Sequence, residues 1–229
     1  MVKNKQNRYM KNKLFLLMTI LIAGLNACQN NNSSTDSAAS ELLKDTVIDI
    51  DNNVYHTFKM GTQIWMVENL KTTHYRNGEA IPNVIDTAGY SRLTTGAYSN
   101  YNNDTNIVET SGRLYNWYAV SDKRLIAPKG WHVPSKEEWK ILLEYINEHE
   151  LPFEKTDSSG WKNGPGFSSV PSGKRLPDGS FINIKQASYW TLTIGNNDRI
   201  IVVENEKANV SMKEESKGAG LSVRCIKDN

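Results

Sequence analysis

One amphipathic helix with a well-marked start constrains this 229-residue chain more than any other feature. Ser135 is a favourable helix N-cap, and Glu138, three residues later, completes a capping box with it. Apolar residues then recur at helical spacing: Trp139, Leu142, Leu143 and Ile146. Residues at i, i+3, i+4 and i+7 lie on one face of a helix. The pattern predicts one long helix over about residues 135–148, buried along that face.

From residue 46 onward, the remaining sequence predicts short strands separated by turns rich in Gly, Asn and Asp. Strands are expected at 47–50, 54–60, 63–67, 189–194, 199–204 and 221–226. Turn residues at 51–53 and 177–179 each predict a hairpin, and residues 114–120 fit either a helix or a strand. A segment of this length is typical of one domain. We therefore expect a single loop-rich α+β domain over residues 46–229.

The N-terminus has the layout of a bacterial lipoprotein signal. Basic residues precede position 14, residues 14–25 are almost entirely apolar, and the small residue Ala27 precedes Cys28. The apolar run is about a dozen residues long, shorter than the ~20 residues that a membrane-spanning helix needs. An ordinary secretory signal and a transmembrane anchor are the alternatives. The resemblance to a lipoprotein signal peptide over residues 1–27 implies cleavage before Cys28 and lipidation of that cysteine, for example with palmitate.

Removal of the signal changes the charge of the chain. The full sequence has 27 basic and 25 acidic residues, and residues 1–27 contain five basic and no acidic side chains. The mature chain therefore keeps 22 basic and 25 acidic residues, a net charge of −3. A weakly acidic chain gives no support for nucleic-acid binding.

Residues 28–45 are small and polar, and they cannot bury enough apolar surface to order themselves. We expect this segment to be a flexible tether that connects the lipid to the domain. Gln29 is not an acidic retention signal, so we expect an outer-membrane lipid anchor in preference to an inner-membrane one. Both a periplasm-facing and a cell-surface location remain open.

Five sequence motifs carry a resemblance to a known family. They occupy residues 61–70, 93–98, 112–120, 127–139 and 221–225. In this order they resemble the Fibrobacter succinogenes major paralogous domain, a family of secreted and lipid-anchored domains common in Bacteroidetes and Fibrobacteres. The helix-opening and C-terminal motifs also resemble C-type-lectin-like domains and formylglycine-generating enzymes. This resemblance implies a C-type-lectin-like α+β fold of irregular antiparallel sheets, with the C-terminal strand returning beside the first.

The cysteines depart from the family pattern. Many relatives carry a cysteine where this chain has Ala127, and that cysteine would be the partner of Cys225. With Cys28 lipidated, Cys225 is the one thiol left and cannot form an intrachain disulfide. We expect Cys225 to be buried on a strand and unreactive. Formylglycine-generating chemistry needs paired cysteines, so the sequence does not support transfer of that enzyme activity.

The histidines and acidic loops do not form a recognisable catalytic or metal motif. His132 is the one of the four histidines expected to be buried, and no HExxH pattern is present. Residues 49–53 resemble the start of a calcium loop but lack its glycine and its closing glutamate, so we expect a polar hairpin turn. The oxygen-rich segments 102–104 and 196–198 could hold calcium, although plain turns are favoured. No cofactor is expected.

The lectin-like resemblance places ligand-binding loops between the long helix and the last strands. On this basis, the candidate binding residues are Trp161, Asn196, Asn197, Asp198, Arg199, Glu204 and Asn205. The tryptophans expected in the core are Trp65, Trp117, Trp131, Trp139 and Trp190. Residues 200–203 are aliphatic, which argues against an aromatic platform for sugars on that strand.

The anchor, the tether and the lectin-like resemblance favour a non-enzymatic binding module of the cell envelope. Its partner would be a polysaccharide or an envelope or extracellular protein. A structural role in an envelope complex is the alternative, and an enzyme with an unrecognised site is a second one. The sequence does not determine the oligomeric state.

Overall fold

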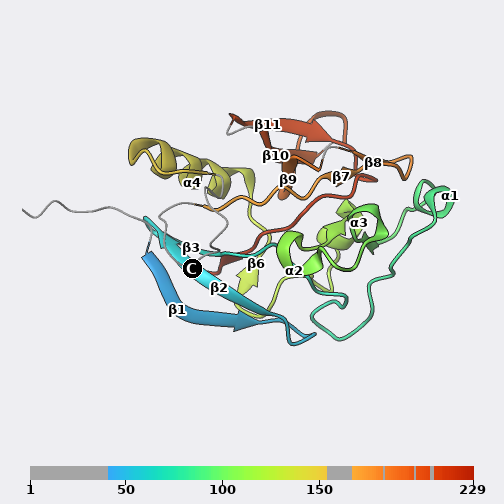
Figure 1. Ribbon diagram of the computed structural model, residues 1–229, viewed down its shortest axis with the longest axis horizontal. Coiled ribbons are helices and arrows are strands. Elements are labelled where there is room, and N and C mark those ends of the chain that lie inside the picture. Colours follow the sequence, from blue (N-terminus) through green and yellow to red (C-terminus); the bar gives the residue numbers. More distant parts are fainter. Residues whose placement is uncertain (1–40, 154–166, 183, 199, 207–208) are drawn as a thin grey trace, which may run out of the picture. The chain divides into compact units, whose positions relative to one another are not determined.

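The computed structural model describes residues 41–153, 167–182, 184–198, 200–206 and 209–229 (Figure 1). The larger sheet has the strand order β1-β2-β3-β12-β6, and all its pairings are antiparallel. Its strands are β1 (Glu41–Ile48), β2 (Val54–Met60), β3 (Gln63–Met66), β6 (Trp131–His132) and β12 (Ile226–Lys227). The smaller sheet has the order β11-β10-β9 and is also antiparallel. Its strands are β9 (Gln186–Ile194), β10 (Ile200–Glu206) and β11 (Asn209–Glu215). The predicted α+β class is confirmed.

The first hairpin forms where it was predicted, but its first strand is longer. Strand β1 begins at Glu41, inside the segment expected to be tether, because its backbone continues to pair with β2 as far as Lys59. The pairing shifts register between Leu43 and Thr46. A bulge of this kind lets a strand continue past a local irregularity. Strand pairing therefore begins at Glu41, before the expected start of the domain at residue 46.

The late strands differ from the prediction in two ways. Strand β11 was not predicted, because its sequence is mostly polar and it lies at the edge of the small sheet. The strand expected over 221–226 is wrong except at its end, where Ile226 belongs to β12. Leu221 bridges to Tyr115 and Ser222 bridges to Tyr189, so this segment pairs with a different neighbour at nearly every step.

Short elements complete the described part of the chain. The helices are α1 (Thr87–Tyr90), α2 (Val108–Ser111) and α3 (Trp117–Val120), with 3-10 turns η1 (Tyr101–Asn103) and η2 (Asn196–Asp198). The two-stranded sheets are β4 (Tyr98–Ser99) with β5 (Leu114–Tyr115), and β7 (Lys174–Arg175) with β8 (Phe181–Ile182), the second being the predicted hairpin. The ambiguous segment 114–120 is a strand followed by a helix. Asn116 separates the two, because its side-chain oxygen accepts hydrogen bonds from the backbone N–H groups of Ala97 and Ala119.

Helix α4 (Lys136–Glu148) confirms the predicted long helix and its capping box. Glu138 N donates to Ser135 Oγ at 3.2 Å, and Ser135 N donates to Glu138 Oε2 at 2.7 Å. Trp139, Leu142 and Ile146 are buried, as their spacing predicts. Figure 1 shows α4 beside the small sheet, in agreement with its contacts to β9 and β10.

Aromatic side chains connect α4 to both sheets. The ring centroid of Trp139 lies 4.9 Å from that of Trp65 on β3 and 5.3 Å from that of Tyr189 on β9. Phe167 completes the cluster, at 5.2 Å from Trp139. Such tilted and edge-on pairs contribute beyond the burial of their area. All five tryptophans expected in the core are buried: Trp65, Trp117, Trp131, Trp139 and Trp190.

Two fully buried arginines hold loops that have little regular structure. Arg175 donates hydrogen bonds to the carbonyl oxygens of Val84 and Ile85, and its guanidinium lies 3.8 Å from the ring centroid of Tyr90. Arg224 donates to Asn69 Oδ1 at 2.7 Å and to the carbonyl of Phe167 at 2.8 Å. A buried charge is stable only when its donors are satisfied, so both contacts fix the loops that accept them.

Among the described residues, none of the helices combines the length and the hydrophobicity that a membrane span requires.

Replacement of Ser135 by Ala should destabilise the domain by about 1 kcal/mol, because the N–H of Glu138 loses its acceptor at the start of α4. Chemical denaturation of wild type and variant measures the difference. The matched control is Thr94→Ala, an exposed site whose side chain has no hydrogen bond within the described residues. A Ser135→Ala variant as stable as this control would show that the cap does not support the fold.

Candidate binding surface

The residues predicted to bind a ligand do not form one exposed surface. Trp161 and Arg199 lie outside the described residues, as does the side chain of Asp198. Asn196 and Asn197 are exposed in η2, at the turn between β9 and β10. The backbone N–H and the side-chain amide of Asn196 both donate to Glu214 Oε1, each at 2.9 Å, which fixes this turn against β11.

Glu204 and Asn205 were predicted to lie on an exposed ligand-binding surface, but both are buried. They lie on β10, which is the central strand of the small sheet between β9 and β11. Glu204 pairs with Lys213 at 2.6 Å and with Lys174 at 3.2 Å. Burial raises the pKa of Glu204, but these two lysines lower it by more, so its pKa lies below the ordinary value. The ion pairs of Glu204 therefore connect β10 to β11 and to β7.

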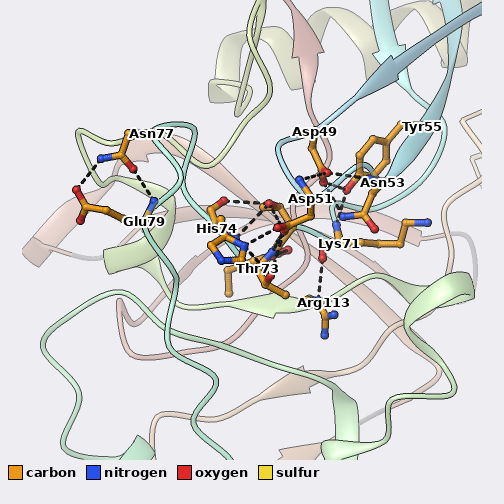
Figure 2. Close-up of polar contacts among 12 residues, drawn as sticks. Asp49, Asp51, Asn53, Tyr55, Lys71, Thr73, His74, Asn77, Glu79 and Arg113 are labelled. Carbon is orange, nitrogen blue, oxygen red and sulfur yellow. Dashed lines mark hydrogen bonds and ion pairs between the residues drawn. The ribbon is translucent and has the colours of Figure 1, made fainter.

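The acidic segment 49–53 forms a polar hairpin turn, as expected (Figure 2). Asp49 accepts hydrogen bonds from Tyr55 OH at 2.6 Å and from the backbone and side chain of Asn53 at 2.9 and 2.8 Å. Asp51 accepts from His74 Nδ1 and from Thr73 N, each at 2.5 Å. Both carboxylates are thus occupied by donors of the protein itself.

The pKa of Asp51 reflects these bonds. Burial raises its pKa, but hydrogen bonds from residues 72–74 lower it by more, so the pKa lies below its ordinary value. Within the described residues, no group of three or more His, Cys, Asp or Glu side chains is arranged to hold a metal ion. The turn therefore serves to fix the hairpin against the segment that carries His74.

His132 is only partly buried, which differs from the expected core position. Its ring is 35% exposed and lies between two carboxylates, with Nε2 2.8 Å from Glu138 Oε1 and Nδ1 2.7 Å from Asp228 Oδ1. Partial burial lowers the pKa of His132, but its bonds to Asp228 and Glu138 raise it by more, so the pKa lies above its ordinary value. The sequence assigned Glu138 to the helix cap alone, whereas its second oxygen also binds His132.

Cys225 is fully buried and is a free cysteine, as predicted. Burial raises the pKa of its thiol above the ordinary value. A buried thiol held in the protonated form is a poor nucleophile and a poor metal ligand. It precedes β12 instead of lying on the strand.

A groove around Arg76 was not found from the sequence. Two cavities, of about 310 and 200 Å³, share Arg76, Ile126 and Ala127 in their walls, and we call the two together the Arg76 groove. Exposed aliphatic side chains line it: Ile48 and Ile50 in the larger cavity, Leu125 and Leu192 in the smaller. Lys129 lies at the larger cavity and His132 at the smaller.

Arg76 fixes the wall of this groove. Its Nε donates to the carbonyl of Ala127 at 2.9 Å, and its Nη2 donates to the carbonyls of Pro128 and Trp131 at 2.7 and 2.8 Å. One signal in the sequence points to this surface. Side chains alternate between the two faces of a strand, so Ile48 and Ile50 point away from the face that carries Val47. The first hairpin therefore has apolar side chains on both faces.

Replacement of Asp228 by Asn should lower stability in a pH-dependent way. The raised pKa of His132 contributes stability that is fully present below the unfolded value of about 6.5 and is lost as pH rises through the folded value. The loss in the variant should therefore be largest below about pH 6.5, should stay under about 1 kcal/mol for this partly exposed pair, and should shrink at higher pH.

Urea denaturation from pH 5 to 9 measures this difference, with Glu144→Gln on the exposed face of α4 as the control. A loss of stability that grows with pH, or that matches the control at every pH, would contradict the assignment.

Along the chain, the five motifs named above lie between the end of β2 and the start of β12. A model of the Fibrobacter succinogenes major domain matches residues 58–227, which include all five. Searches of curated proteins and of solved structures find no match. The chain therefore belongs to the Fibrobacter succinogenes major domain family.

Proposed function

We propose that this protein is a lipid-anchored, non-catalytic binding module of the cell envelope whose partner is another protein. The observation that carries the proposal is the set of aliphatic side chains exposed around the Arg76 groove: Ile48, Ile50, Leu125 and Leu192. Clustered exposed apolar side chains beside a cavity are typical of interaction sites.

A protein partner fits this surface better than a polysaccharide. Sugars are commonly held by stacking on aromatic rings, and the large apolar side chains exposed in the described residues are all aliphatic. Trp161 lies outside those residues, so a sugar site that uses this side chain is tested separately, by glycan binding of a Trp161→Ala variant.

The polar groups support binding over catalysis. The carboxylates of Asp49 and Asp51 accept hydrogen bonds from donors such as Tyr55 and His74, and the thiol of Cys225 is buried.

The lectin-like fold belongs to the same proposal. It is supported by β12, which returns to the sheet of β1 and β2, although its direct neighbours are β3 and β6.

The anchor places the module at the outer membrane, facing the periplasm or the cell surface. Cys28 ends an apolar signal, and only a short polar segment separates it from the start of β1 at Glu41.

Mass spectrometry of the N-terminal peptide tests the anchor. The mature chain purified from bacterial membranes should begin at Cys28 and carry acyl chains, and Cys28→Ala should abolish incorporation of labelled palmitate. Cys225→Ala is the matched control, because it removes the other cysteine and should leave the label unchanged. An unmodified Cys28, or a label that survives Cys28→Ala, would contradict lipid anchoring.

Crosslinking of the full chain in intact cells of its source then tests for a partner. A defined protein adduct is expected, and crosslinking only to glycan would replace the protein partner with the polysaccharide alternative.

A further inference from the structure

We propose that the Arg76 groove binds an acidic peptide segment of the partner, in which one carboxylate is flanked by branched aliphatic side chains. The proposal rests on the proposed function, because it names the chemistry of the protein that the module binds. It is carried by the unused donors of Arg76 and by the position of this residue between two aliphatic cavities.

Arg76 has donors available for a carboxylate. Its Nε and Nη2 donate to backbone carbonyls, and its Nη1 has no hydrogen-bond partner among the described residues. No carboxylate in that part of the chain lies within 4.0 Å of its guanidinium. Three neutral acceptors hold the group in place without neutralising its charge. A guanidinium fixed in this way binds a carboxylate with little further loss of conformational freedom.

The acidic side chains at the groove are already occupied. Asp49 lines the larger cavity, but Tyr55 and the turn at Asn53 donate to its carboxylate. Asp228 lines the smaller cavity and is bonded to His132. Lys129 is exposed at the larger cavity and forms no ion pair with a described residue. The donors to Asp49 are neutral and do not offset its carboxylate, but Arg76 and Lys129 outnumber it, and Asp228 is paired with His132. This excess of cationic donors at the groove favours an anionic ligand.

The positions of the two cavities on either side of Arg76 determine which side chains the ligand places there. Arg76 is common to both cavities, with Ile48 and Ile50 on one side and Leu125 and Leu192 on the other. An extended peptide places successive side chains at regular intervals, so a carboxylate at Arg76 sets the neighbouring side chains over the two cavities. The geometry thus favours an Asp or Glu with Ile, Leu or Val on both sides.

Selection from a random seven-residue peptide library, displayed on phage, tests this inference on the full lipidated chain held in nanodiscs. The enriched peptides should contain Asp or Glu flanked within two residues by Ile, Leu or Val. Fluorescence anisotropy with the best peptide should then show affinity reduced by about tenfold or more in Lys129→Glu and in Ile50→Asn. Both side chains are exposed, so these variants are expected to fold.

The matched controls are Lys140→Glu and Ile141→Asn on the exposed face of α4, which should bind within about twofold of wild type. Amidation of the acidic side chain should weaken binding, whereas amidation of the peptide C-terminus in a separate peptide should not; the reverse result would overturn the inference.

Enrichment of basic or aromatic sequences, the absence of enrichment, or peptide binding that the groove variants leave unchanged would each overturn the inference. A partner adduct in cells that persists in Lys129→Glu and Ile50→Asn would overturn the groove and leave the proposed function standing. Failure of lipidation and of crosslinking would overturn the proposed function, whereas selected peptides that still bind at the groove would uphold this inference.

Discussion

The buried guanidinium of Arg224 connects parts of the chain that are far apart in sequence. Its Nη2 and Nε donate to Asn69 Oδ1, 155 residues away, and its Nη1 donates to the carbonyl of Phe167. It also lies 4.4 Å from the ring centroid of Phe167 and 5.4 Å from that of Tyr189. A fully buried charge is tolerated only with such partners, so the fold must bring these segments together. The family motifs at 61–70 and 221–225 meet at this contact, which makes them a packing signature.

The aromatic core includes the two rings that Arg224 contacts, Phe167 and Tyr189. Phe167 and Tyr189 pack on Trp139 of α4, and Trp139 packs on Trp65 of β3, so the helix and both sheets share one cluster. The domain keeps this arrangement without a disulfide between described residues, since Cys225 is free and buried. Arg175 secures the loop at 84–86 by the same means. With these loops fixed, the hairpin turn at 49–53 and the segment 125–131 can present the Arg76 groove.

Sequence motifs of a few residues correctly predicted the structures that neighbouring residues form among themselves. Ser135 and Glu138 marked the start of α4, and the turn residues at 51–53 marked the first hairpin, because caps and turns are formed by neighbouring residues. Contacts between residues far apart in the sequence could not be predicted. For example, one of the two carboxylates bonded to His132 belongs to Asp228, 96 residues away. Glu204 was expected at the surface because β11 was not predicted from its polar sequence. With β11 present, β10 is the central strand of the small sheet. The Arg76 groove was missed because its walls come from five separate segments: residues 48–50, Arg76, residues within 120–133, Leu192 and Asp228.

The most direct test is a double-mutant cycle on Arg224 and Asn69, measured by urea denaturation of the chain without its lipid. Arg224→Met and Asn69→Ala should each destabilise the fold by about 1–3 kcal/mol, since each leaves a buried hydrogen-bonding group without its partner. The double variant should lose less than the sum of the two by more than about 1 kcal/mol, because the second change removes a group already deprived of its partner. Two losses that add, or single losses below about 0.5 kcal/mol, would show that this contact does not hold the segments together.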